Sequence, residues 1–238
     1  MAPTEHIVAS FDRDLEGIQA NIMRMGGLVE DAIAKAAQAF DARDPELAET
    51  VRRGDAAIDA LDTQINEEAA RIIAQRQPIA TDLRLVLSVF RISNNLERIG
   101  DLAKNIAKRT EAILDQPPVN GTGASLRRMA RQVELMLKDV LDAYIQHDAD
   151  KAADVRERDL EVDQMYSALF REYLTFMMED PRHITTCMHL HFMAKNIERM
   201  GDHTTSIAEQ VIYMVTGEAP DEERPKQDTL HESGGDPR

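Results

Sequence analysis

The sequence has little of what builds β-sheets or disulfide frameworks. Of its 238 residues, one is cysteine, none is tryptophan and 4% are aromatic. The lone Cys187 cannot form an internal disulfide and has no second thiol to complete a cysteine-based metal site. Ala, Leu, Ile, Met, Glu and Arg are plentiful instead, which favours helices. The composition therefore predicts an all-α protein from a reducing compartment, and we expect it in the cytoplasm.

Positive charge and long apolar runs are also scarce. Lys and Arg number 28 against 43 Asp and Glu, which gives a formal net charge of −15. A generic nucleic-acid-binding protein needs a basic face to neutralise phosphates. No run of eighteen apolar residues is present, and the first ten residues lack the charged and apolar regions of an export signal. We therefore expect no nucleic-acid binding and no membrane insertion.

Helix-breaking and helix-capping residues divide the chain into six long segments. Asp44-Pro45 and Asp180-Pro181 each combine an N-cap with a proline in the first helical turn. The pair Gly26-Gly27 lies inside the first segment and favours close helix packing or a kink. The expected helices cover roughly residues 11–43, 45–75, 79–114, 125–146, 150–179 and 181–216.

The two halves of the chain repeat one another. Seven residues between positions 40 and 59 recur 104 positions later with the same or similar chemistry, and the third helices match at an offset of 101. Such self-similarity indicates a duplicated structural unit, and short turns make successive helices antiparallel neighbours. We therefore predict two tandem antiparallel three-helix bundles. Their expected limits are 1–116 and 125–217, with a linker over 117–124 and a disordered tail over 218–238.

Two acidic motifs stand out, one in each repeat. Residues 95–101 read NLERIGD and residues 196–202 read NIERMGD. In each motif a Glu precedes an Asp by four positions, so both carboxylates lie on one face of a helix. Like charges at this spacing destabilise a helix by roughly a few tenths of a kcal/mol. The motifs therefore require a compensating cation or partner.

The second helix of each repeat places more acids beside these motifs. If the second and third helices form a hairpin that turns near Pro78 or Pro181, apolar residues face each other close to the turn and acids face each other farther out. Four carboxylates then converge within about one helical turn, roughly 6 Å of axis. The expected facing pairs, and the eight candidate metal ligands, are Asp59 with Glu97 and Asp55 with Asp101 in the first repeat, and Asp163 with Glu198 and Asp159 with Asp202 in the second.

Oxygen ligands alone suit hard or borderline cations such as Mg²⁺, Mn²⁺, iron or Ca²⁺, and Zn²⁺ stays open. His191, two turns before Glu198, is a candidate extra ligand, although a lone helix histidine is more often packed or solvated. Two alternatives to a non-catalytic metal site remain. The protein can be a metal-free helical interaction scaffold whose acids form a solvated face neutralised by Arg98 and Arg199, or it can be a helical carboxylate metalloenzyme.

The enzyme alternative has little support in the residues. A ferritin-like di-iron site needs a Glu-x-x-His motif on each of two helices, and none of the seven histidines follows a Glu by three positions. Nucleophile-elbow, Walker and dinucleotide-binding motifs are also missing from the sequence. We therefore predict no catalytic residues and no enzymatic activity.

Several longer stretches are similar to a known family. They are residues 23–30 (MRMGGLVE), 76–84 (RQPIATDLR), 96–101 (LERIGD), 177–180 (MMED) and 197–202 (IERMGD). Together they resemble the PhoU family of phosphate-specific transport system accessory proteins, over most of the chain from about residue 5 to residue 217. The resemblance implies two three-helix bundles related by a pseudo-twofold axis. It also implies multinuclear iron or other metal clusters on the eight acids named above.

The same resemblance implies a biological role. A protein of this family is expected to be a cytoplasmic negative regulator of the phosphate-starvation response. It would link the phosphate ABC transporter ATPase to a phosphate-sensing histidine kinase and restrain uptake when phosphate is ample. We also expect a homodimer. Composition and spacing by themselves indicate only two duplicated sites that attract cations.

Overall fold

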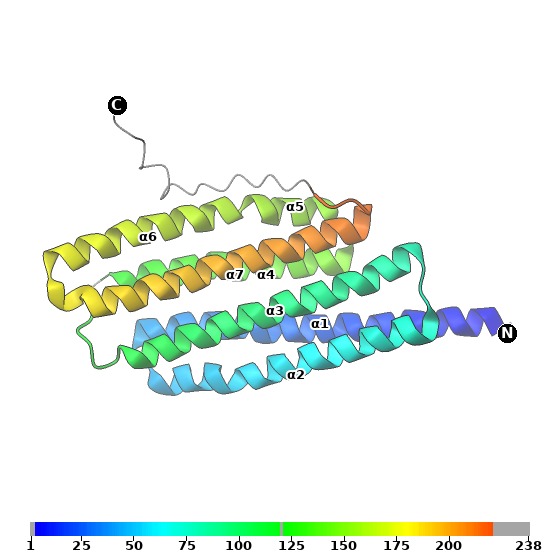
Figure 1. Ribbon diagram of the computed structural model, residues 1–238, viewed down its shortest axis with the longest axis horizontal. Helices are drawn as coiled ribbons and strands as arrows, with labels where there is room; N and C mark the ends of the chain where they lie inside the picture. The colour runs from blue at the N-terminus through cyan, green and yellow to red at the C-terminus, as the bar shows by residue number, and fades with distance from the viewer. Residues whose placement is uncertain (1–2, 120, 221–238) are drawn as a thin grey trace, which may run out of the picture.

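The structure, a computed structural model, describes residues 3–119 and 121–220 (Figure 1). Within these residues the chain is helical and contains no strand, which confirms the all-α prediction. The predicted tail falls almost entirely outside the described residues. The first bundle consists of α1 (Pro3–Ala42), α2 (Pro45–Arg76) and α3 (Ala80–Ala112), and the second of α4 (Thr122–Gln146), α5 (Ala149–Glu157), α6 (Asp159–Glu179), the 3₁₀ turn η1 (Pro181–His183) and α7 (Ile184–Thr216).

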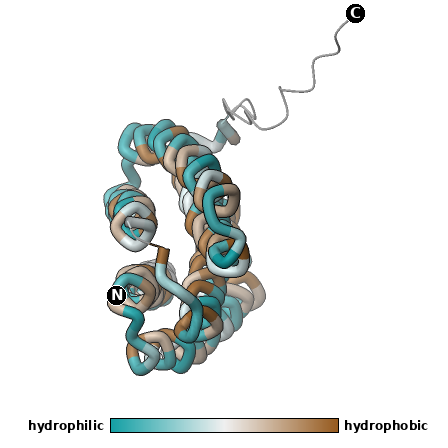
Figure 2. Tube along the Cα trace, turned by 90° about the vertical axis from the view of Figure 1, so that its left-hand side faces the viewer, coloured by the Kyte–Doolittle hydropathy of each residue, from teal (hydrophilic) through white to brown (hydrophobic). Residues whose placement is uncertain are grey.

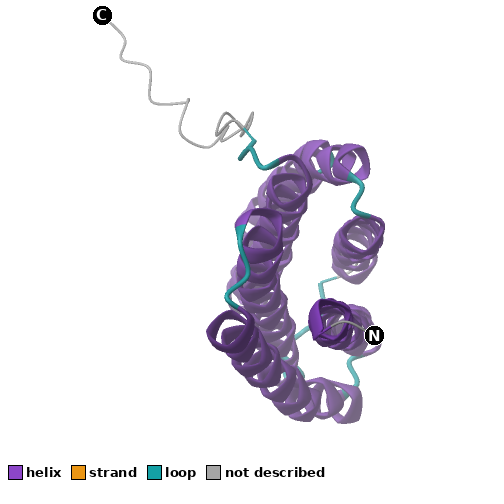
Figure 3. Cartoon of the chain, turned by 90° about the vertical axis from the view of Figure 1, so that its right-hand side faces the viewer, coloured by secondary structure: helices purple, strands orange, loops and turns teal. Residues whose placement is uncertain are grey.

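The helices are arranged in two layers. Viewed end-on, α1 and α4 form one layer, while α2, α3, α7 and the α5–α6 pair form a curved second layer (Figures 2 and 3). Contacts join α1 to α4 and α3 to α7, so the two bundles meet along most of their length. This arrangement confirms two tandem three-helix bundles. None of the helices in the described residues is long and apolar enough to cross a membrane.

Apolar periodicity builds the core of each bundle. On α3 the buried residues recur at steps of three and four, as in Val89, Ile92, Leu96, Ile99 and Ala103, and such a stripe buries one face of a helix against its neighbours. Near the turns, two apolar residues on the stripes that lead into the acidic motifs, Leu87 of α3 and Met188 of α7, are 45% and 41% exposed.

The Asp-Pro signals mark helix starts as predicted. The Asp44 carboxylate accepts hydrogen bonds from the backbone N–H groups of Glu46 (2.9 Å) and Leu47 (3.0 Å). The Asp180 carboxylate accepts one from the N–H of Arg182 (2.9 Å). Asp180, however, caps the 3₁₀ turn, and the last α-helix begins three residues later than expected.

The second helix of the second repeat is broken, whereas the sequence predicted one helix as far as residue 179. The break lies at Arg158, whose carbonyl accepts from the N–H of Glu161 at 3.1 Å, an i to i+3 bond of the 3₁₀ type that tightens the turn. The Arg158 guanidinium donates to Asp139 of α4 at 2.6 Å and ties the break to the neighbouring helix. In the first repeat α2 continues through the equivalent position, Gly54.

Helices α1 and α4 approach closely at Gly26. A Cβ atom there would overlap Cδ1 of Leu141 and lie 3.4 Å from its Cδ2, so a larger residue must displace Leu141. A Cβ at Gly27 would meet nothing within 4 Å. The expectation of close packing is therefore confirmed for Gly26, and it concerns the contact between the two bundles.

Candidate functional site

Each repeat carries a patch of four acids between its second and third helices. The first patch comprises Asp55 and Asp59 of α2 with Glu97 and Asp101 of α3. The second comprises Asp159 and Asp163 of α6 with Glu198 and Asp202 of α7.

Several contacts agree with the helix pairing that was expected to bring these acids together. In the first repeat the Ser93 hydroxyl of α3 donates to Asp62 of α2 at 2.6 Å, about one turn from Glu97 and Asp59. In the second repeat the ring centroids of Phe170 and His191 lie 5.1 Å apart. Lys195 Nζ of α7 lies 5.1 Å from the ring centroid of Tyr166 of α6. Helices α2 and α3, and likewise α6 and α7, therefore face each other in the predicted register.

The glycine of each acidic motif lets a side chain of the preceding helix come close, and in the second repeat that side chain is an aspartate. A Cβ at Gly201 would lie 3.0 Å from Oδ1 of Asp159, and one at Gly100 would lie 3.0 Å from Cδ1 of Ile58 and 3.8 Å from Oδ1 of Asp55. A Cβ contact of 3.0 Å is tight, so a larger residue would have to push back Asp159 at Gly201 and Ile58 at Gly100. Asp55 and Asp159 are themselves buried, at 5% and 8% exposed.

The acids of the first patch lie near enough to repel one another. Burial raises the pKa of Asp59, and the negative charge of Asp55 raises it further. Burial also raises the pKa of Glu97, followed by the charge of Asp101. Asp59 and Glu97 therefore ionise less readily than they would alone in water.

A lysine that the sequence interpretation overlooked neutralises part of this charge. Lys104 Nζ donates to the Asp55 carboxylate and, at 3.0 Å, to Oδ1 of Asp101, and so joins α2 to α3. These two hydrogen bonds hold the pKa of Lys104 above its usual range. Arg98, one of the neutralising groups proposed from the sequence, is a weaker partner, since its Nε lies 3.6 Å from Glu97 and its side chain is 57% exposed.

The lysine of the second patch, Lys195, precedes its motif, whereas Lys104 follows the motif of the first patch. Lys195 Nζ donates to Oε1 of Glu198 at 2.8 Å. Burial raises the pKa of Glu198, Lys195 opposes that rise, and the charges of Asp202 and Asp163 add to it. The charges of Asp202 and Asp163 therefore reach Glu198.

The side chains as they lie do not fit a metal ion. Among the described residues, no group of three or more His, Cys, Asp or Glu side chains is arranged to hold one. Lys104 and Lys195 donate to carboxylates that a metal would need. Both lysines stand three residues from a motif acid, Asp101 or Glu198, on the same helix face, and this spacing could have revealed them. The metal-binding prediction for the eight acids stays a prediction.

His191 has aromatic neighbours. Its ring centroid lies 5.9 Å from that of Tyr166, 5.1 Å from that of Phe170 and 5.5 Å from that of Phe192. Burial lowers its pKa, and the nearby Lys195 lowers it further. These contacts match the packed histidine that was the alternative to a ligand.

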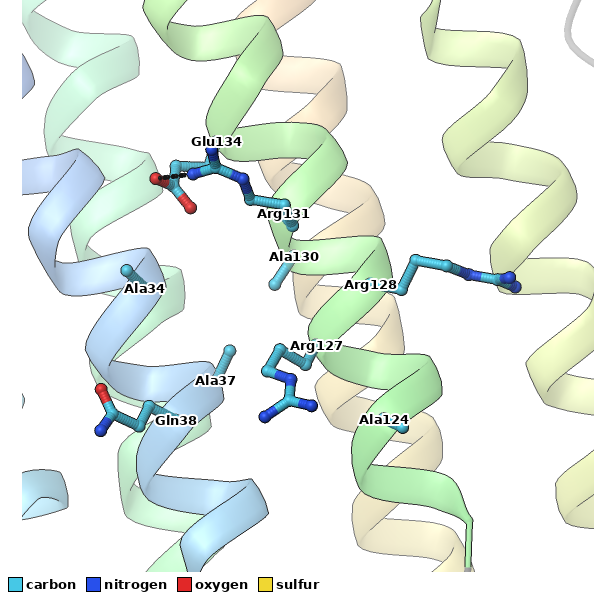
Figure 4. A pocket seen from close by; sticks show the side chains of 9 residues that line it. All are labelled: Ala34, Ala37, Gln38, Ala124, Arg127, Arg128, Ala130, Arg131 and Glu134. Carbon is cyan, nitrogen blue, oxygen red and sulfur yellow. Dashed lines mark hydrogen bonds and ion pairs between the residues drawn. The ribbon is translucent and has the colours of Figure 1, made fainter.

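A groove of about 620 Å³ lies between α1 and α4, away from the acidic patches (Figure 4). Arg127 and Arg131 line it, but each is paired within the chain, with Asp41 and Glu134 respectively, at 2.5 Å. Arg128 points away from α1 in Figure 4. Arg127 and Arg131 therefore already have acidic partners within the chain.

The family model for the PhoU domain matches residues 22–110 and, a second time, residues 126–211. This chain belongs to the PhoU family. Both matched ranges lie inside the repeats expected from the sequence, and they correspond to the two bundles. The family membership suggested by the five sequence stretches is confirmed.

Relatives within the PhoU family match almost the whole chain. The phosphate-specific transport system accessory protein PhoU homolog of Caulobacter vibrioides is 47% identical over 227 residues, which cover 95% of this chain and 99% of that protein. The homolog of the same name from Rhizobium meliloti is 47% identical over 223 residues, which cover 94% of each chain.

Solved PhoU structures share the fold. The crystal structure of PhoU from Pseudomonas aeruginosa superposes with a TM-score of 0.84 at 39% identity, covering 87% of this chain and all of that one. The phosphate transport system regulatory protein PhoU from Streptococcus pneumoniae gives 0.81 at 31% identity, covering 89% of this chain and 99% of that one.

Proposed function

We propose that this protein is an accessory regulator of phosphate-specific transport and has no catalytic activity of its own. The observation that carries the proposal is the 47% identity, over nearly full length, to relatives named as accessory proteins of that transport system. The regulatory protein from Streptococcus pneumoniae, which shares the fold, supports the same role.

We further propose how the regulation works. The protein acts in the cytoplasm as a negative regulator of the phosphate-starvation response, and it contacts both the phosphate ABC transporter ATPase and a phosphate-sensing histidine kinase. The curved layer of α2, α3, α7 and α5–α6 offers long helix surfaces on which partner domains can dock (Figure 3). The net charge of −15 favours partners with basic surfaces. We propose a homodimer as the working form.

A deletion strain tests the regulatory role. In phosphate-rich medium, loss of the gene should cause constitutive expression of a phosphate-starvation reporter, and a plasmid copy of the gene should restore repression. Normal repression in the deletion strain would contradict the proposal. A pull-down of the purified transporter ATPase by this protein tests the first contact, with the isolated kinase domain as the second bait.

We also propose that the two acidic patches bind divalent or trivalent metal ions, with iron the first candidate and Zn²⁺, Mn²⁺ or Mg²⁺ as alternatives. The support is electrostatic: burial, and then the charges of neighbouring carboxylates, raise the pKa values of Asp59, Glu97 and Glu198, and a bound cation would favour the ionised form of each. Binding requires side chains to rearrange. Elemental analysis of protein purified without a nickel column should show metal, and Asp101→Ala combined with Asp202→Ala should lower the content. Unchanged content in the double variant would count against it.

A further inference from the structure

The two patches differ in the position of their internal cation. When the third helices are aligned at the offset of 101, the position of Lys104 in the first repeat is taken by Thr205 in the second, and that of Lys195 is taken by Asn94 in the first. Each patch therefore has one lysine, but at non-equivalent sites.

In the first patch the ammonium group bridges the two helices. Lys104 of α3 donates to Asp55 of α2 and to Asp101 of its own helix. The Asp55 side chain is only 6% exposed, and that of Lys104 is 25% exposed. A positive group that bridges carboxylates from both helices stands where a bridging metal ion would need to bind.

In the second patch the equivalent residue supplies no charge. Thr205 is fully buried, and its hydroxyl donates to the backbone carbonyl of Gly201 at 3.0 Å. The Lys195 ammonium donates to Glu198 of its own helix and lies over the ring of Tyr166 of α6. The second repeat thus carries no lysine at the position that bridges α2 and α3 in the first.

We propose that the Lys104 ammonium replaces a metal ion in the first patch, so that this repeat neutralises its carboxylates with its own chain and binds one ion fewer than its acids alone would. The inference rests on the metal binding proposed above. A metal ion at Asp55 and Asp101 would have to displace Lys104, because two positive charges a few ångströms apart repel strongly in a partly buried site. The ammonium is tethered, so it competes at a high effective concentration.

Equilibrium dialysis of the full chain with Mn²⁺ tests the proposal. Lys104→Met removes the ammonium and keeps most of the side-chain volume, Lys104→Thr reproduces the second repeat, and Lys104→Arg keeps the charge. The Met and Thr variants should each bind one more Mn²⁺ per chain than the wild type, and the Arg variant should bind the same number. Lys108→Met, at an exposed position one turn further along α3, is the matched control and should change nothing.

The extra ion must also be located. Asp55→Asn added to Lys104→Met should abolish it, whereas Asp159→Asn in the same background should leave it. In metal-free buffer Lys104→Met should lower the melting temperature, and Mn²⁺ should restore it. Equal Mn²⁺ binding by wild type, Lys104→Met and Lys104→Thr would overturn the proposal.

The result for Lys104 and the proposed function can fail independently of each other. Absence of Mn²⁺ from the wild type would remove the metal proposal for the native protein, but the difference between the Lys104 variants and the wild type would still decide the role of Lys104. The reporter assay in the deletion strain is independent of both.

Discussion

Replacing Gly26 with alanine tests whether the close approach of α1 and α4 determines how the two bundles pack. The added methyl group would overlap Cδ1 of Leu141 and lie 3.4 Å and 3.5 Å from its Cδ2 and Cγ. Leu141 is only 1% exposed, so it has little room to move away. Gly27 is the matched control because a methyl group there meets nothing within 4 Å.

The comparison isolates the steric cost. Overpacking a buried contact costs roughly 1–3 kcal/mol, while glycine to alanine inside a helix stabilises by roughly 0.5–1 kcal/mol. Both substitutions are in α1, so the helix gain cancels in the difference between them. We expect Gly27→Ala to be slightly more stable than the wild type, and Gly26→Ala to be about 1–3 kcal/mol less stable than Gly27→Ala.

Thermal unfolding followed by circular dichroism gives the assay. For a chain of this size, 1 kcal/mol corresponds to about 2–4 °C in melting temperature, so the two alanine variants should differ by several degrees. Leu141→Ala is destabilising by itself, but Gly26→Ala should cost less in a Leu141→Ala background than in the wild type, because the cavity left at Leu141 can accept the methyl group. If Gly26→Ala and Gly27→Ala unfold at the same temperature, the contact does not constrain the packing and the reasoning is refuted.

Three further predictions follow from single side chains. Burial raises the pKa of Glu198 above 4.5, so the contribution of Glu198 to stability is complete below pH 4.5 and is lost as the pH rises through the folded-state pKa. Glu198→Gln should therefore reduce the decline in melting temperature between pH 4.5 and neutrality. An unchanged pH profile in this variant would argue against the prediction. Burial lowers the pKa of His203 below 6.5, so its contribution is present above pH 6.5 and is lost as the pH falls through the folded-state value. Its Nδ1 lies 2.9 Å from Oδ1 of Asn95 across the contact between the bundles. His203→Gln should make unfolding less sensitive to pH below 6.5, as measured in urea at several pH values. The Arg43 guanidinium donates to three backbone carbonyl groups at the end of the first repeat, those of Ile113 and Gln116 at 3.0 Å and that of Leu114. Arg43→Ala should lower the free energy of unfolding in urea by roughly 1.5–3 kcal/mol, and Arg43→Lys should lower it less. Equal stability of the wild type and both variants would show that these hydrogen bonds contribute nothing.

Local patterns in the sequence predicted most of the secondary structure. Asp44 and Asp180 cap the segments that follow them because a carboxylate beside a proline satisfies the free N–H groups of a helix start. The break at Arg158 was not predictable in this way. It involves a hydrogen bond to Asp139 on another helix, and a side-chain contact of that kind leaves no periodic signal in the sequence.

The sequence predicts which acids of two neighbouring helices lie at the same level along the helix axis. A short turn and the helical period determine which residues of two adjacent helices share a level, which is why Asp55 and Asp101 could be paired in advance. Lys104, which donates hydrogen bonds to both Asp55 and Asp101, was not predicted. Its long side chain reaches from α3 to α2, and the sequence does not specify where the ammonium group of such a side chain lies.

The sequence by itself determined the helical class, the duplicated three-helix plan, the family and the two acidic motifs, because each depends on residue type and spacing along the chain. Only the tertiary structure decided how deeply each acid is buried, which lysine neutralises it and how the bundles meet through α1, α4, α3 and α7. These properties depend on distances between residues that are far apart in the chain. In the first repeat they give the buried Asp55 an ammonium partner of its own, and in the second they place a threonine at the equivalent position.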